Sequence, residues 1–353
     1  MKGIKLIFIA AILAIVGVGV FLFGNELSLK AALLVSSDPE GQMVYLDGQE
    51  LGSTPLNIGD LAGGEFTLTF SEFSQKIHLT GGALTVVDWV FGPSEIFSAG
   101  DIVWLSPAGG GAELLVIAKP AAEVFLNGSS VGESPLSKEI QPGEYTLEIR
   151  EDGYFPRTLT VAVKEGYRLN VQANLSLNPL PEVASELEAG GQHIKVMDLS
   201  SGEVPLLADF AAWAAGAAFY AKRGEESYNF FLTAEGKLYD IDGSEVSLSS
   251  LAQQEEDITI GYLGEEGRGL AVAASATLEQ MQSVLFPTPP KVLVLETGTG
   301  FLRVRSGPGK TFSEVGKATP GETYDYLGEE SGWFKIDFNG SEGWVSGQYA
   351  QKL

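Results

Sequence analysis

The chain of 353 residues carries 46 Asp and Glu residues against 22 Lys and Arg residues, and this net charge of −24 disfavours nucleic acid as a partner because phosphates repel it. It contains no cysteine, which excludes disulfides and a lipidated cysteine anchor and leaves apolar cores as the source of stability. The length exceeds that of a single core, and 44 glycines with few long helical patterns predict several domains that are mostly β.

The apolar segment at residues 6–23 predicts a helix that spans a membrane. It reads LIFIAAILAIVGVGVFLF, and a helix of this length measures about 27 Å, close to the hydrocarbon thickness of a bilayer. Lys2 and Lys5 precede it, so the positive-inside rule places the N-terminus in the cytoplasm and the C-terminal bulk outside it. We therefore expect residues 1–28 to be a cytoplasmic N-terminus and signal anchor in the cell membrane. A cleaved secretory signal peptide is the alternative, although no clean Ala-x-Ala site follows the apolar core.

Residues 39–70 and 120–149 are two copies of one sequence pattern. A repeat of this size is one structural unit used twice. In the alignment Leu46-Asp47-Gly48 falls on Leu126-Asn127-Gly128, Thr54-Pro55-Leu56 falls on Ser134-Pro135-Leu136, and Gly64-Glu65-Phe66-Thr67-Leu68 falls on Gly143-Glu144-Tyr145-Thr146-Leu147. The short apolar runs predict strands, and both Asx-Gly pairs predict hairpin turns, because each position must tolerate positive φ. Each copy is therefore expected to form a small β-sandwich.

The two copies resemble the PEGA domain, whose Pro-Glu-Gly-Ala motif corresponds to Pro39-Glu40-Gly41-Gln42 in the first copy. The second copy departs from the motif, with Pro120-Ala121-Ala122-Glu123, but keeps the pattern that follows. We expect the first domain at residues 33–85 and the second at 112–177. The resemblance implies an accessory module of bacterial and archaeal surface proteins, without catalytic residues.

Residues 86–111 form an aromatic-rich connector between the two copies. Trp89, Phe91, Phe97 and Trp104 make it too apolar for an ordinary linker. Large aromatic side chains mostly serve cores, so we expect the connector to extend the first sandwich or to pack between the two units. Exposed tryptophans that dock a partner or a carbohydrate are the alternative.

The middle block, residues 190–286, predicts a small α+β or β domain. Ser227–Leu232 and Lys237–Ile241 have the pattern of short strands, whereas Phe210–Lys222 fits either a pair of strands or a buried helix. Thr277-Leu278-Glu279-Gln280 fits a capping box and predicts the start of a helix.

The middle block is also where an enzyme active site would have to lie. Asp240, Asp242 and Glu245 suggest a calcium loop, but the spacing lacks the regular acidic ladder of an EF-hand, and a hairpin turn explains the same residues. The two histidines, His78 and His193, have no visible partner, and nucleophile or zinc motifs are missing. We therefore expect no enzyme activity, catalytic residue, metal ligand or cofactor, although carboxylate pairs leave a glycosidase as an alternative.

The C-terminal region begins after a stiff Pro-rich linker at residues 287–290. Within residues 291–353, apolar and polar side chains alternate at Leu302-Arg303-Val304-Arg305 and at Phe334-Lys335-Ile336-Asp337, and Asn339-Gly340 predicts a hairpin turn. Five short strands with tight turns in about sixty residues predict a small closed β-barrel.

This region resembles the bacterial SH3 domain. The matching residues are Val304-Arg305-Ser306-Gly307-Pro308, Pro320-Gly321, Gly332-Trp333, Asn339-Gly340 and Gly343-Trp344-Val345. The resemblance implies a module that binds cell wall or protein through a groove of aromatic and polar side chains. The candidate ligand-binding residues are Tyr324, Tyr326, Trp333, Trp344, Tyr349, Arg303 and Arg305. A place in the barrel core is the alternative for Trp333 and Trp344.

The order of these segments predicts a single-pass envelope protein. The repeats would act as spacers or interaction modules, and the SH3-like domain would bind peptidoglycan or an envelope protein. A membrane-tethered enzyme with its catalysis in residues 190–286 is one alternative. An accessory subunit of a larger envelope complex is another.

Overall fold

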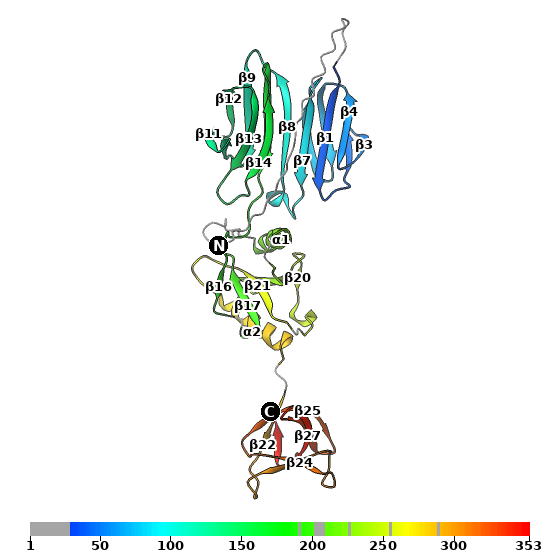
Figure 1. The fold of residues 1–353 in the computed structure, drawn as a ribbon, viewed down its shortest axis with the longest axis vertical. Helices are drawn as coiled ribbons and strands as arrows, with labels where there is room; N and C mark the ends of the chain where they lie inside the picture. Colours follow the sequence, from blue (N-terminus) through cyan, green and yellow to red (C-terminus); the bar gives the residue numbers. More distant parts are fainter. Residues whose placement is uncertain are drawn as a thin grey trace. The chain divides into compact units, whose positions relative to one another are not determined.

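The computed structural model describes residues 29–189, 191, 193–200, 209–224, 227–253, 256–287 and 290–353. Within these ranges no helix is long and apolar enough to cross a membrane, and the helix expected at residues 6–23 lies outside them. The chain divides into two units, one of Met1–Leu251 with Glu256–Gln280 and one of Ala252–Glu255 with Met281–Leu353. Both units are built mostly from β-strands (Figure 1).

The first repeat is a two-layered β structure with an apolar core. Its strands are β1 (Ala31–Asp38), β2 (Met43–Leu46), β3 (Gln49–Ser53), β4 (Leu56–Leu61), β5 (Gly64–Phe70), β6 (Phe73–Leu79) and β7 (Leu84–Val90). One layer is a four-stranded sheet in the order β3-β2-β5-β6, and the other contains β4-β1-β7. Leu33, Val35, Leu68 and Ile77 are buried between the layers.

The second repeat reproduces this arrangement strand for strand. Its strands are β9 (Ala112–Lys119), β10 (Glu123–Leu126), β11 (Ser129–Glu133), β12 (Leu136–Ile140), β13 (Gly143–Arg150), β14 (Arg157–Val163) and β15 (Tyr167–Asn174). Its layers are β11-β10-β13-β14 and β12-β9-β15. The prediction of one structural unit used twice is therefore confirmed.

Both predicted Asx-Gly turns are present, and each Asx side chain closes its hairpin onto a neighbouring strand. Asp47 and Asn127 both have φ of 49°. Asp47 Oδ1 accepts a hydrogen bond of 2.7 Å from the Thr67 N–H, and Asn127 Oδ1 accepts one of 2.8 Å from the Thr146 N–H. The side chains of Asp47 and Asn127 therefore stabilise the two hairpin turns.

The connector joins the two repeats into one continuous sheet. After a short 3₁₀ turn, η1 (Glu95–Phe97), it forms β8 (Ala99–Pro107), which pairs antiparallel with β7 on one side and with β15 on the other. The result is a seven-stranded sheet in the order β12-β9-β15-β8-β7-β1-β4 (Figure 1). The boundary that we expected after residue 85 falls inside β7.

The two four-stranded sheets cover opposite faces of this shared sheet. Along β8, Val103 and Leu105 belong to the core of the second repeat, whereas Ile102 and Trp104 contact the core of the first. Successive side chains of a strand point to opposite faces, so both faces of β8 are covered by protein. A strand that is buried on both faces has a continuous apolar run, which explains the composition of the connector. Its tryptophans Trp89 and Trp104 pack against the first core.

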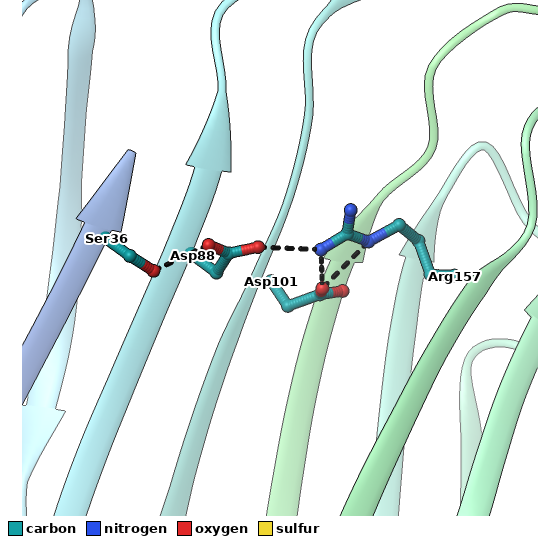
Figure 2. Close-up of polar contacts among 4 residues, drawn as sticks. All are labelled: Ser36, Asp88, Asp101 and Arg157. Carbon is teal, nitrogen blue, oxygen red and sulfur yellow. Dashed lines mark hydrogen bonds and ion pairs between the residues drawn. The ribbon is translucent and has the colours of Figure 1, made fainter. Parts of the chain in front are cut away.

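A buried ion pair lies where the second four-stranded sheet meets the shared sheet (Figure 2). Asp88 and Asp101 are direct cross-strand neighbours on β7 and β8, an arrangement that is destabilising for like charges. Arg157 at the start of β14 compensates them, because its Nε donates to Asp101 Oδ2 at 2.8 Å and its Nη2 donates to Asp88 Oδ2 at 3.2 Å and to Asp101 Oδ2. Ser36 Oγ donates to Asp88 Oδ1 at 2.6 Å.

The ion pair has no counterpart in the first repeat. Arg157 pairs with Ile149 across the β13–β14 hairpin, and Phe73 holds the same place opposite Phe70 in the β5–β6 hairpin. The Phe73 ring lies edge-on to Trp89, with 4.8 Å between ring centroids. The two copies therefore use an aromatic contact and an ion pair at the same position of the fold.

The middle block is an α+β domain, which agrees with one of the two predicted classes. Its elements are β16 (Ser185–Leu187), β17 (Ile194–Asp198), α1 (Phe210–Ala221), β18 (Phe230–Thr233), β19 (Leu238–Asp240), β20 (Glu245–Val246), η2 (Leu248–Ser250), β21 (Ile258–Leu263) and α2 (Val272–Leu285). The sheet order is β16-β17-β21-β18-β19-β20, with β17, β21 and β18 parallel. The two predicted strands are confirmed as β18 and β19.

Of the two alternatives for Phe210–Lys222, the buried helix is correct. Asp209 caps α1 by accepting hydrogen bonds from the N–H groups of Ala211 and Ala212. The helix predicted near Thr277 is confirmed as α2, but the capping box is wrong, because α2 begins at Val272 and Thr277 lies inside it. Thr277 Oγ1 instead donates to the Gly236 carbonyl at 2.8 Å, so it ties the helix to the β18–β19 turn.

Helix α1 packs on the connector between the repeats. The Tyr220 hydroxyl donates to the Phe97 carbonyl at 3.0 Å and lies 2.5 Å from Ser176 Oγ. Burial raises the pKa of Tyr220 to about 12, which keeps the hydroxyl proton in place for these bonds. Gly216 faces the Phe97 ring so closely that a Cβ there would lie 2.3 Å from Phe97 Cζ.

The C-terminal domain is a seven-stranded antiparallel sheet in the order β24-β23-β27-β26-β25-β22-β28. Its strands are β22 (Lys291–Val294), β23 (Leu302–Arg305), β24 (Glu314–Ala318), β25 (Thr323–Glu330), β26 (Trp333–Phe338), β27 (Ser341–Ser346) and β28 (Ala350–Lys352). The Asn339-Gly340 turn is present, with φ of 57° and 80°. We expected five strands in a closed barrel. Among the strand pairs of the described residues β24 and β28 do not meet, so closure stays a prediction.

Replacement of Arg157 by Leu should lower the free energy of unfolding by about 3–5 kcal/mol, because it leaves the buried Asp101 carboxylate without its partner. Urea unfolding measures this loss. The matched control is Arg168→Leu, which removes a partly exposed ion pair with Glu113 and should cost less than about 1 kcal/mol. Similar losses in the two variants would contradict a stabilising role of the buried pair.

The defect of Arg157→Leu should depend on pH. Burial raises the pKa of Asp101 above its ordinary value of 3.8, and Arg157 opposes this rise, so the pKa should climb further in the variant. The folded variant then binds a proton that the unfolded chain releases, and its stability falls as the pH increases through that range. Unfolding at about pH 7 and about pH 5 should show a smaller defect at the lower pH. A defect that is independent of pH would contradict ionisation of Asp101 as the cause.

Gly216→Ala should destabilise the contact between α1 and the connector, since the new methyl group overlaps the Phe97 ring. The expected cost is about 1–3 kcal/mol, measured through the fluorescence of Trp213, which is buried in the same core. In a Phe97→Ala background, which itself loses buried apolar contacts, Gly216→Ala should cost less than it does in the unchanged protein, because the overlap is gone. An equal cost of Gly216→Ala in both backgrounds would count against this contact.

Candidate functional site

A groove of about 560 Å³ lies on the surface of the C-terminal domain. It is bounded by the loop before β23, the loop after β23, the start of β26 and the end of β27. Its lining residues are Thr297, Gly298, Thr299, Phe301, Leu302, Arg303, Arg305, Lys310, Trp333, Ser346 and Tyr349. A groove with aromatic and cationic walls offers both stacking surfaces and charged hydrogen-bond donors to a ligand.

Four of the seven residues singled out from the sequence line this groove, namely Arg303, Arg305, Trp333 and Tyr349. Tyr349 is 40% exposed. Because Arg305 lies on β23, Trp333 on β26 and Tyr349 after β27, the sheet brings together side chains that are far apart in the sequence.

The other three candidates lie elsewhere in the domain. Tyr324 and Tyr326 pack against the apolar core. The Tyr324 hydroxyl donates to Glu322 at 2.6 Å, and burial, followed by this bond, raises the pKa of Tyr324 to about 12. Trp344 is half-buried on β27, opposite Arg305 and Lys335, and does not line the groove.

The loop after β23 fixes the position of Arg305. The Ser306 N–H donates to the Ser313 carbonyl at 2.9 Å and closes the loop. The Phe312 ring covers Gly307, where a Cβ would lie 2.4 Å from the ring, so glycine is required there. The Phe312 carbonyl in turn accepts a hydrogen bond of 2.6 Å from Arg305 Nη1.

Comparison with known families agrees with this arrangement. The family described as "PEGA domain" matches residues 31–93 and 114–179, and the family described as "Bacterial SH3 domain" matches residues 300–351. The chain contains two PEGA domains and a bacterial SH3 domain. The PEGA matches run just past the ends of β7 and β15, and eight of the eleven groove residues of the SH3 domain lie within the matched residues.

One curated relative shares a short segment with the chain. It is the YrvJ protein of Bacillus subtilis (strain 168), whose name describes a candidate N-acetylmuramoyl-L-alanine amidase. The two are 42% identical over 48 residues, which is 14% of this chain and 9% of that protein. The likeness therefore covers less than a tenth of the relative's length.

Several lining residues of the SH3 groove were not expected from the sequence. Thr297, Thr299 and Phe301 belong to a loop in which both threonine hydroxyls donate to the Phe301 carbonyl, at 2.9 and 3.1 Å. Lys310 belongs to the loop that holds Arg305. Glycine and threonine clusters mark both segments as loops, but no local pattern shows that they face one groove.

The polar residues of the middle domain have structural partners. Asp240 Oδ1 accepts hydrogen bonds of 2.9 Å from the N–H groups of Asp242 and Ser244, so the acidic segment builds a turn. His193 pairs with Asp257 at 2.9 Å on the surface. Within the described residues no group of three or more acidic or histidine side chains could hold a metal ion.

Proposed function

We propose that this protein is an extracytoplasmic envelope protein, anchored in the cell membrane through residues 6–23, whose SH3 domain binds the peptidoglycan of the cell wall. The observation that carries the proposal is the groove of the SH3 domain, with Trp333 and Tyr349 beside the cations Arg303, Arg305 and Lys310. Aromatic rings and charged donors together suit a ligand that contains sugar and peptide groups.

Two further observations support the proposal. The name of the Bacillus relative describes an amidase that acts on N-acetylmuramoyl-L-alanine, a linkage between a cell-wall sugar and its peptide. Residues 6–23 are long and apolar enough for a membrane anchor, and the cationic residues before them favour a cytoplasmic N-terminus.

In this proposal the PEGA pair acts as a spacer and the chain works by binding rather than by catalysis. The shared seven-stranded sheet supports the spacer role, because two domains with a common sheet do not hinge between them. Asp88 and Asp101 form a close carboxylate pair, but Asp101 is 0% exposed and both are bonded to Arg157, which supports a structural use of this pair.

Sedimentation with purified cell-wall sacculi tests the proposal. We expect the full chain to sediment with the sacculi, and a chain that ends before residue 291 to stay in solution. Tyr349→Ala should weaken binding about tenfold, since one aromatic contact contributes about 1.5 kcal/mol.

The matched control is Leu327→Ala, which removes an apolar side chain that is 48% exposed on the same domain but lies outside the groove. It should bind sacculi like the unchanged protein. Equal sedimentation with and without the SH3 domain would refute wall binding by that domain, and a protein that co-purifies with the full chain would then favour an accessory subunit.

A further inference from the structure

We propose that the SH3 groove recognises a free carboxylate of a cell-wall peptide, and that Arg305 is the residue that binds it. This inference rests on the proposed wall binding and adds the chemical group that is recognised. Arg305 would hold the carboxylate through two parallel hydrogen bonds. Lys310 would add positive charge, and Trp333 and Tyr349 would contact the neighbouring apolar parts of the peptide.

The charge of the groove differs from that of the chain. Acidic residues outnumber basic ones by 46 to 22 in the whole sequence, yet the groove is lined by three cationic side chains and by no acidic one. Glu314 neutralises Arg303 from outside the lining, with 3.1 Å between Arg303 Nε and Glu314 Oε2. Arg305 and Lys310 therefore supply the net positive charge of the groove.

Arg305 is unusual among the arginines of this protein. The chain has seven, all within the described residues, and the other six each form an ion pair with a carboxylate. Arg305 bonds only to a neutral group, the Phe312 carbonyl, through Nη1 at 2.6 Å. A guanidinium that is held in place without a carboxylate partner is prepared to accept one from a ligand.

The geometry of that bond leaves the useful edge of the guanidinium open. With Nη1 bound to Phe312, the Nε and Nη2 donors remain, and these two N–H groups form the parallel fork that matches a carboxylate. Arg150 uses this same fork on Glu148, with Nε and Nη2 each 2.6 Å from a carboxylate oxygen. A phosphate polymer would need a row of cations, whereas the groove has only two, Arg305 and Lys310, that form no ion pair among the described residues.

Calorimetric titration of the full chain with two probes tests the proposal. One probe is a synthetic cell-wall stem peptide with free carboxylates, and the other is the same peptide with every carboxylate converted to an amide. We expect the carboxylate peptide to bind at least tenfold more tightly, and Arg305→Gln to remove this preference. Arg305→Lys keeps the charge but loses the fork, so it should retain part of the preference.

Lys291→Gln is the matched control, because it removes one positive charge from the same domain outside the groove and should keep the full preference. Equal binding of the two peptides by the unchanged protein would overturn the inference. If the chain still sediments with sacculi in that case, only the inference fails, whereas loss of both results refutes wall binding as well. Sedimentation that disappears when phosphate polymers are extracted from the sacculi would also overturn it.

Discussion

The PEGA pair depends on the ion pairs that the guanidinium of Arg157 forms with Asp88 and Asp101. It lies against two aspartates that face each other across β7 and β8, and its charge makes that arrangement tolerable in a buried position. Asp101 Oδ1 has no hydrogen-bond partner, so the cluster is not fully satisfied even with Arg157 present. Because Asp88 comes from the first repeat, Asp101 from the connector and Arg157 from the second, the cluster forms only when all three segments have assembled.

The middle domain is built onto this assembly at the connector. Phe97 lies between the shared sheet and α1, where it contacts Gly216 and offers its carbonyl to Tyr220. Arg223, just beyond α1, forms an ion pair of 3.0 Å with Asp38 at the end of β1. A chain segment with the composition of a linker could not make these contacts, which explains why aromatic residues are needed between two copies of the repeat.

Much of the fold could be predicted from the sequence, because turn chemistry and repetition are local properties. The Asp47-Gly48 and Asn127-Gly128 hairpins and the Asn339-Gly340 turn needed only their own residues. The shared sheet could not be predicted in this way, since the apolar run of β8 fits a strand in one core as well as a strand between two. The capping role predicted for Thr277 was wrong because its hydroxyl donates to the carbonyl of Gly236, which is distant in the sequence, and not to the start of a helix.

The candidate site, too, could be predicted only in part from the sequence. Family resemblance pointed to aromatic and cationic residues, and Arg305, Trp333 and Tyr349 line one groove. It could not separate them from Tyr324 and Tyr326, which lie on β25 and pack against the core, because the sequence does not show which aromatic side chains face the groove. Lys310 was missed because its loop is placed by the packing of Phe312 on Gly307, a contact that no spacing reveals.

The order of strands in the shared sheet also determines how the PEGA pair would respond to a pulling force. Strands β1 and β15, where the chain enters and leaves the pair, run in the same direction with β7 and β8 between them. Tension applied at the start of β1 and the end of β15 would slide these strands past one another rather than peel them apart. The hydrogen bonds between these strands lie across the direction of the force, so all of them would have to break together. The two PEGA domains would therefore resist the force as one unit.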